Sequence, residues 1–186
     1  MNYKFGVYGD SIAFGYGNNN QSWFDIVSLG SKAIKLAQNG ETVCNVLEKI
    51  KLDNNCYEVL YVAVGVNDLL VLGLESGKID FSFLMRKYEE VLKIALIKSK
   101  KVIVQSLLPV REELFPNQDW LDDDKWCYNL DIKEFNRRLC VLCDKLKVQY
   151  KDVYSKFCTK NLESIYIDAV HLNKIGQEEL SLFMKL

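Results

Sequence analysis

This sequence of 186 residues contains few prolines and one histidine, and it has no large excess of charge of either sign. Only two prolines occur, Pro109 and Pro116, so no proline-rich linker divides the chain, and we predict one domain over residues 1–186. The 24 basic side chains nearly balance the 25 acidic ones, which argues against a nucleic-acid-binding surface. We therefore expect a small molecule as the partner, and no nucleic acid.

Long hydrophobic runs are also missing, although hydrophobic residues make up 49% of the chain. No apolar run approaches the roughly 20 residues that a membrane-spanning helix needs, so we expect no membrane partner. The first residues, MNYKFGVYGDS, lack the basic start, apolar stretch and cleavage site of a secretory signal, which favours a cytoplasmic location. Cysteines in that compartment are expected to be buried thiols rather than disulfides. The six are Cys44, Cys56, Cys127, Cys140, Cys143 and Cys158.

Strand-like and helix-like apolar patterns alternate along the chain, which predicts an α/β fold with a parallel sheet. The strand-like stretches are residues 4–9, 32–37, 58–65 and 101–108, and the clearest helical patterns are 81–101 and 132–150. Residues 111–129 follow neither period. Since long connections in compact domains are often binding loops, we interpret this segment, which contains Phe115, Trp120 and Trp126, as one.

The first strand-like stretch runs into GDSIAFG, residues 9–15. Gly-Asp-Ser is by itself typical of a turn, and a serine hydroxyl becomes a nucleophile only when a nearby base removes its proton. His171 is the single histidine of the chain, and Asp168 lies three residues before it, close enough within one turn to reach the imidazole Nδ1 atom. Ser11, His171 and Asp168 are therefore a candidate catalytic triad.

Attack on an ester carbonyl also needs hydrogen-bond donors for the developing oxyanion. The backbone N–H of Ser11, the backbone N–H of Gly40 in AQNGET and the side-chain amide of Asn67 in GVND are the candidates. Each follows a different predicted strand. Because the carboxyl ends of parallel strands share one edge of the sheet, we predict that these residues converge there with Asp168 and His171.

The four blocks GDSIAFG, AQNGET, GVND and DAVHLN resemble, in this order, the motif blocks of the SGNH hydrolases, the GDSL esterase and lipase superfamily. The resemblance covers almost the whole chain, from Gly9 to Gly176. It implies a flavodoxin-like three-layer αβα sandwich with a parallel sheet of about five strands. It also implies that Ser11, Asp168 and His171 form the catalytic triad, and that Ser11, Gly40 and Asn67 form the oxyanion hole.

The leading interpretation is a serine esterase that forms an acyl-enzyme and needs no metal or cofactor. The polar residues 18–21 beside the nucleophile and the lack of a hydrophobic lid favour a small acyl group, such as an O-acetyl group on a sugar. A lipase, lysophospholipase or thioesterase of the same family is an alternative. From another class, the chain could be a non-catalytic flavodoxin-like binding or phosphoryl-signalling module that uses Asp10 and Asp68.

Several further residues admit both a structural and a functional interpretation. We expect Asp10 to brace the turn that holds Ser11, and Asp68 to cap the structure after Asn67. Cys140 and Cys143 could begin a zinc site, but no second close pair supplies further ligands, so we expect core thiols. The acidic run 122–124 is expected in a solvated loop. Four aromatic residues either line a substrate platform or pack in the core: Tyr16, Trp23, Trp120 and Trp126.

Overall fold

A five-stranded parallel sheet forms the centre of the protein, with the strand order β2-β1-β3-β5-β7. The computed structural model describes residues 1–72, 79–115 and 125–186. The strands of the sheet are β1 Asn2–Gly9, β2 Ala33–Lys35, β3 Cys56–Ala63, β5 Ser99–Gln105 and β7 Gln149–Lys151. Two short strands, β4 Val71–Leu72 and β6 Lys125–Trp126, pair antiparallel outside this sheet. The predicted α/β fold with a parallel sheet of about five strands is confirmed.

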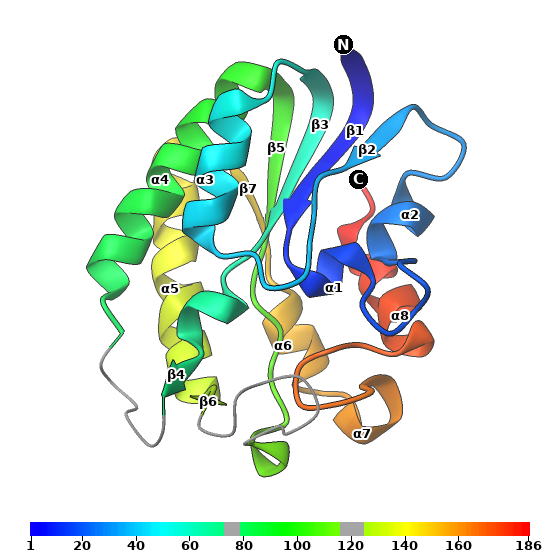
Figure 1. Cartoon of the computed structure of the whole chain (residues 1–186), viewed down its shortest axis with the longest axis vertical. Coiled ribbons are helices and arrows are strands. Elements are labelled where there is room, and N and C mark those ends of the chain that lie inside the picture. Colours follow the sequence, from blue (N-terminus) through cyan, green and yellow to red (C-terminus); the bar gives the residue numbers. More distant parts are fainter. Residues whose placement is uncertain (73–78, 116–124) are drawn as a thin grey trace.

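Helices cover both faces of the sheet (Figure 1). One layer contains α3 Val43–Leu52, α4 Phe81–Lys98 and α5 Asn129–Leu146, and the other contains α2 Trp23–Val27 and α8 Lys174–Met184. The connections carry the short helices α1 Ser11–Phe14, α6 Val153–Phe157 and α7 Leu162–Ile165, and the 3₁₀ turns η1 Val66–Leu69 and η2 Glu112–Leu114. In the described residues, no helix combines the length and apolar character that crossing a bilayer requires.

The central strands β1 and β3 explain the most apolar stretches of the sequence. β3 pairs with β1 on one side and β5 on the other, and its last five residues are all buried. A parallel strand that is covered by helices on both faces needs apolar side chains at every position rather than at alternate ones. This is why EVLYVAVG is continuously apolar from Val59 onwards.

Two helices end earlier than the sequence pattern predicts. α4 ends at Lys98, three residues before the predicted limit, because β5 already begins at Ser99. α5 ends at Leu146, where Lys147 adopts the left-handed conformation with φ 57°. The chain then reverses into the edge strand β7, which the pattern did not predict. Three residues are too few to show the alternation by which a strand is recognised.

The burial of Trp23 and of the cysteines could not be predicted reliably from the sequence. Trp23 is fully buried and packs edge-on against Tyr61 at 5.3 Å, so it belongs to the core and not to a substrate platform. All six cysteines are free. Cys127 and Cys143 are buried as expected, Cys44 and Cys140 are partly buried, and Cys56 and Cys158 are exposed. No group of three or more His, Cys, Asp or Glu residues in the described part of the chain could hold a metal ion.

Candidate active site

Ser11 stands where β1 gives way to α1 at the carboxyl edge of the sheet (Figure 1). Asp10 is the N-cap of α1, and its Oδ1 accepts a hydrogen bond from the Ile12 amide at 3.0 Å, which confirms its expected bracing role. Gly9 is needed because an added Cβ would lie 2.5 Å from the Ala13 Cβ and 2.8 Å from the Ala63 carbonyl oxygen. The local sequence therefore places Ser11 on a tight turn against the end of β3.

His171 lies against Ser11 although the two are far apart in the sequence. The Ser11 Oγ atom is 2.8 Å from His171 Nε2, and His171 Nδ1 is 2.7 Å from Asp168 Oδ2. Both Ser11 and His171 are buried, with exposed fractions of 4% and 5%. An imidazole that donates its Nδ1–H to Asp168 carries no proton on Nε2, so that Nε2 can accept the serine proton. The structure thus joins the three predicted residues in one hydrogen-bonded chain.

A tight turn between α7 and α8 holds Asp168 and His171 together. Asp168 Oδ1 accepts hydrogen bonds from the amides of Val170 and His171, at 2.8 and 2.7 Å. The Ile167 amide closes the turn by donating to the His171 carbonyl at 2.9 Å. Burial by itself would raise the pKa of Asp168, but the hydrogen bonds from the His171 ring and from these amides outweigh it and lower the pKa. Asp168 is therefore held as a carboxylate facing the imidazole.

Two polar side chains connect these segments in a way that the sequence did not predict. Gln177 on α8 donates from Nε2 to the Ile12 carbonyl and accepts from the Trp23 amide, at 3.0 and 2.9 Å. Asn18 donates to the carbonyl of Leu172, next to His171, at 2.7 Å. No motif marks either residue. Gln177 could have been found as a polar residue on the buried face of α8, which it shares with Leu180.

The candidate aromatic residues lie in different environments. Tyr16 lies on His171, with 4.3 Å between the ring centroids, so it forms part of the wall beside the imidazole. Trp126 stacks on Tyr128 at 6.2 Å. Trp120, Pro116 and the acidic run 122–124 lie outside the described residues.

The predicted oxyanion donors Asn67 and Gly40 come from neighbouring loops that are tied together. Asn67 is in η1, and its Nδ2 donates to the carbonyl of Glu41 at 2.9 Å, which leaves a second N–H on the same atom. Gly40 precedes Glu41, is exposed and has φ 74°, with open space where a side chain would begin. The Glu41 carboxylate in turn pairs with Lys49 of α3 at 2.7 Å. The hydrogen bond from Asn67 connects η1 to the loop that contains Gly40.

The sequence suggested that Asp68 caps the structure after Asn67, but the structure shows a different role. The Asp68 carboxylate accepts the amide of Val43, at 3.0 and 3.2 Å, and so caps the start of α3. Burial raises the pKa of Asp68 to about 6, and burial followed by the charge of Asp68 raises that of Asp10 to about 7. A phosphoryl-signalling site would need exposed carboxylates, whereas Asp10 is 2% exposed.

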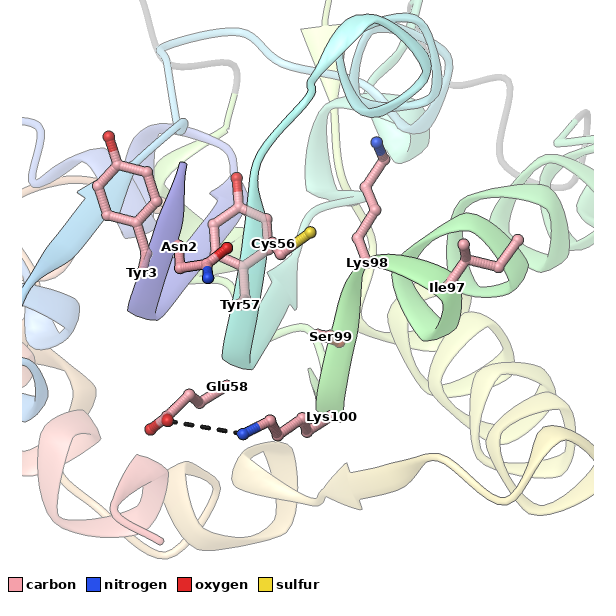
Figure 2. A pocket seen from close by; sticks show the side chains of 9 residues that line it. All are labelled: Asn2, Tyr3, Cys56, Tyr57, Glu58, Ile97, Lys98, Ser99 and Lys100. Carbon is pink, nitrogen blue, oxygen red and sulfur yellow. Dashed lines mark ion pairs between the residues drawn. The ribbon is translucent and has the colours of Figure 1, made fainter.

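A hollow of about 350 Å³ at the other end of the sheet is unrelated to these residues. It lies at the starts of β1, β3 and β5, where Tyr3, Tyr57 and Lys98 project (Figure 2). The dashed line in Figure 2 marks the ion pair between Lys100 Nζ and Glu58 Oε1, which are 3.8 Å apart. Because Ser11 follows the carboxyl end of β1, this hollow and the candidate active site occupy opposite edges of the sheet.

Comparison with known proteins gives a family match and several solved structures of similar fold. The model of the GDSL-like lipase/acylhydrolase family matches residues 7–179. A search of curated protein sequences finds no match. Among solved structures, a lipolytic protein of the G-D-S-L family from Veillonella parvula has a TM-score of 0.72 at 16% identity, over 97% of this chain and 94% of the other.

Two acetylxylan esterases have similar folds. The acetyl xylan esterase AlAXEase has a TM-score of 0.74 at 18% identity, covering 97% of both chains. Axe2 from Geobacillus stearothermophilus has a TM-score of 0.73 at 14% identity, over 98% of this chain and 92% of the other. At these identities the likeness concerns the fold.

Proposed function

Because this chain belongs to the GDSL-like lipase/acylhydrolase family and is a carboxylic ester hydrolase, we propose that it works through a triad of Ser11, His171 and Asp168. The observation that carries this proposal is the chain of two hydrogen bonds, 2.8 and 2.7 Å long, that connects the serine hydroxyl to the imidazole and the imidazole to the carboxylate. We propose further that one domain performs the whole reaction.

In the first half of the reaction, the Ser11 Oγ atom attacks the acyl carbonyl carbon while His171 Nε2 takes the hydroxyl proton. The imidazolium that forms is stabilised by Asp168, and it then gives the proton to the leaving alcohol as the ester C–O bond breaks. The acyl group remains on Ser11 as an ester. In the second half, His171 removes a proton from water, and the resulting attack releases the acid and restores Ser11.

The tetrahedral intermediates carry a negative oxygen that needs preorganised donors. We assign this role to the backbone amide of Ser11, the backbone amide of Gly40 and the second N–H of Asn67 Nδ2. The bond from Asn67 to the Glu41 carbonyl supports this assignment, because it orients the Asn67 amide and ties it to the loop that contains Gly40.

For the substrate, we propose a small acyl ester on a polar carrier, with an O-acetyl group on a sugar as the favoured case. A hollow of about 550 Å³ borders the loop that follows α1; polar side chains such as Asn18, Gln21 and Glu178 line it together with the apolar Ile26 and Leu29, and the triad residues are not among its lining residues. Amide and carboxylate groups suit the hydroxyl groups of such a carrier. The two acetylxylan esterases of similar fold are consistent with this choice.

An acyl-chain series tests the substrate proposal. With p-nitrophenyl esters from acetyl to octanoyl, we expect kcat/KM to be highest for acetyl and to fall by at least about tenfold by octanoyl, since a small acyl site rejects longer chains. An O-acetylated sugar should then exceed p-nitrophenyl acetate in kcat/KM. A preference for octanoyl would instead indicate a lipase or lysophospholipase, and a preference for thioesters a thioesterase.

A further inference from the structure

The loop of residues 15–22, between α1 and α2, places the ring of Tyr16 against the imidazole of His171. The ring centroids are 4.3 Å apart, and the ring planes are inclined by 37°. An edge-to-face pair has nearly perpendicular planes, so these two rings overlap with their faces. Ser11 Oγ and Asp168 Oδ2 contact the two nitrogens of the same imidazole. Tyr16 therefore packs on the ring that accepts the serine proton in the proposed reaction.

The contact between Tyr16 and His171 changes strength with the charge of the imidazole. The face of a phenol ring carries partial negative charge and attracts a cation that lies within about 6 Å of the ring centre. When His171 takes the Ser11 proton, it becomes such a cation, with its charge spread over the ring. His171 is buried and Tyr16 is half-buried, so water screens the attraction only in part. The contact is thus stronger in the transition state than in the resting enzyme, and such interactions accelerate the chemical step.

We propose that Tyr16 is a catalytic residue, because the face of its ring stabilises the imidazolium of His171 while the acyl group is transferred to and from Ser11. The inference rests on the proposed function of Ser11 and His171. It gives a reason for the path of the loop of residues 15–22, which has to keep the ring over the imidazole. Two polar side chains hold this loop in the required position.

Asn18 joins the middle of the loop to the segment that carries the imidazole. Its Nδ2 atom donates to the carbonyls of Tyr16 and Leu172, at 3.1 and 2.7 Å. Leu172 directly follows His171 in the sequence. One side-chain amide therefore connects the residue that carries the phenol ring to the residue next to the imidazole, and it limits the movement of the two rings relative to each other.

Lys35, on the edge strand β2, holds the two ends of the same loop. Its Nζ atom donates to the carbonyls of Phe14 and Asn20, at 3.1 and 2.6 Å, and to Asp25 Oδ2 at 2.6 Å. These three contacts match the three N–H donors of an ammonium group. Because Phe14 and Asn20 lie on either side of Tyr16 in the chain, Lys35 closes the loop around it. Lys35 is a positioning residue for Tyr16.

Fluorination of the ring at position 16 tests the proposal, because fluorine withdraws negative charge from the ring face and largely preserves the shape of the ring. Phenylalanine, a trifluorinated phenylalanine and pentafluorophenylalanine replace Tyr16 in turn. We expect Tyr16→Phe to keep most of kcat/KM for p-nitrophenyl acetate, since it retains the stacked face. Along the fluorinated series, kcat/KM should then fall stepwise, by roughly tenfold in total. A flat series would overturn the proposal.

Tyr3 is the matched control for this series. It is also half-buried and stacked, on Tyr57 at 6.1 Å between the ring centroids, and Lys32 Nζ lies 5.0 Å from the centre of its ring. Fluorination of Tyr3 therefore weakens a cation–π contact at the opposite edge of the sheet, and kcat/KM should not change. A fall at Tyr3 equal to that at Tyr16 would assign the effect to a general loss of stability and contradict the proposal.

A double-mutant cycle tests the role of Lys35 with ordinary substitutions. Tyr16→Leu removes the aromatic face, and Lys35→Met removes the three hydrogen bonds of the ammonium group. We expect Tyr16→Leu to lower kcat/KM by roughly tenfold and Lys35→Met by a similar or smaller factor. The double variant should be no less active than Tyr16→Leu, since Lys35 acts through Tyr16.

Lys32→Met is the matched control for Lys35→Met, because Lys32 is exposed and lies three residues away, before β2. We expect this variant to keep full kcat/KM. Full activity in Tyr16→Leu would overturn the catalytic role of Tyr16. Losses that multiply in the double variant would overturn the positioning role of Lys35.

Ser11→Ala separates this inference from the proposed function. If Ser11→Ala keeps the esterase activity, His171 has no serine proton to take, and the triad and the role of Tyr16 fail together. If Ser11→Ala is inactive while the fluorinated series at position 16 is flat, the triad stands and only the role of Tyr16 fails. An inactive Ser11→Ala together with a stepwise fall in the series supports both.

Discussion

Replacing Ser11 with alanine is expected to lower kcat for ester hydrolysis by roughly 10⁴- to 10⁶-fold. The loss is large because no acyl-enzyme can form without the Ser11 Oγ atom, which leaves only the oxyanion donors and substrate binding. The variant should remain folded, since only one oxygen is removed from a turn that Asp10 and Gly9 define. Steady-state kinetics with p-nitrophenyl acetate, together with a thermal unfolding curve, provides the measurement.

Ser181→Ala is the matched control for this substitution. Ser181 is also buried, at 2% exposed, but it lies on α8 and donates to the carbonyl of Glu178. We expect it to retain full activity. Activity above a few per cent in Ser11→Ala would remove Ser11 from the role of nucleophile.

Asp168→Asn is expected to lower kcat by about 10⁴-fold. If the side-chain oxygen of the new asparagine keeps the amides of Val170 and His171, its NH₂ group faces His171 Nδ1 in place of the carboxylate oxygen. The ring must then accept at Nδ1 and carry its proton on Nε2, where it can no longer take the proton of Ser11. KM should change little, because Asp168 is assigned to the imidazole and not to the substrate.

Asp144→Asn, an exposed position on α5, controls for loss of a carboxylate and should leave kcat unchanged. A small effect of Asp168→Asn on kcat would contradict the assigned role. Stability gives a second readout. Because the pKa of Asp168 is lowered in the folded protein, its carboxylate stabilises the fold above the ordinary pKa of about 4, and this contribution is lost as the pH falls below that value.

Residues with a chemical reason to stand together could be predicted from the sequence. The three-residue spacing from Asp168 to His171 predicted their contact, because one turn brings a carboxylate to an imidazole. The contact between Ser11 and this pair could be predicted for two reasons. The chain has one histidine, and the carboxyl ends of parallel strands share one edge of the sheet. The central strands β1 and β3 were equally visible, since burial on both faces leaves a continuous apolar run.

Contacts that depend on three-dimensional packing left no comparable signal. Asn18 and Gln177 fasten the catalytic segments through hydrogen bonds to backbone carbonyls, which any nearby carbonyl could accept. Asp68 was assigned to its own turn because the sequence does not show that the start of α3 lies beside η1. A tryptophan is equally suited to a binding site and to a hydrophobic core, so the sequence left the role of Trp23 open. Its packing on Tyr61 shows that it belongs to the core.

The nucleophile is tested most directly by covalent labelling of the purified protein with a serine-directed phosphonate, followed by mass spectrometry of its peptides. We expect one adduct per chain, on Ser11, with esterase activity lost in step with labelling and no adduct at this position in Ser11→Ala. An adduct on another residue that accompanies the loss of activity, or full activity with Ser11 modified, would contradict the role of Ser11 as the nucleophile.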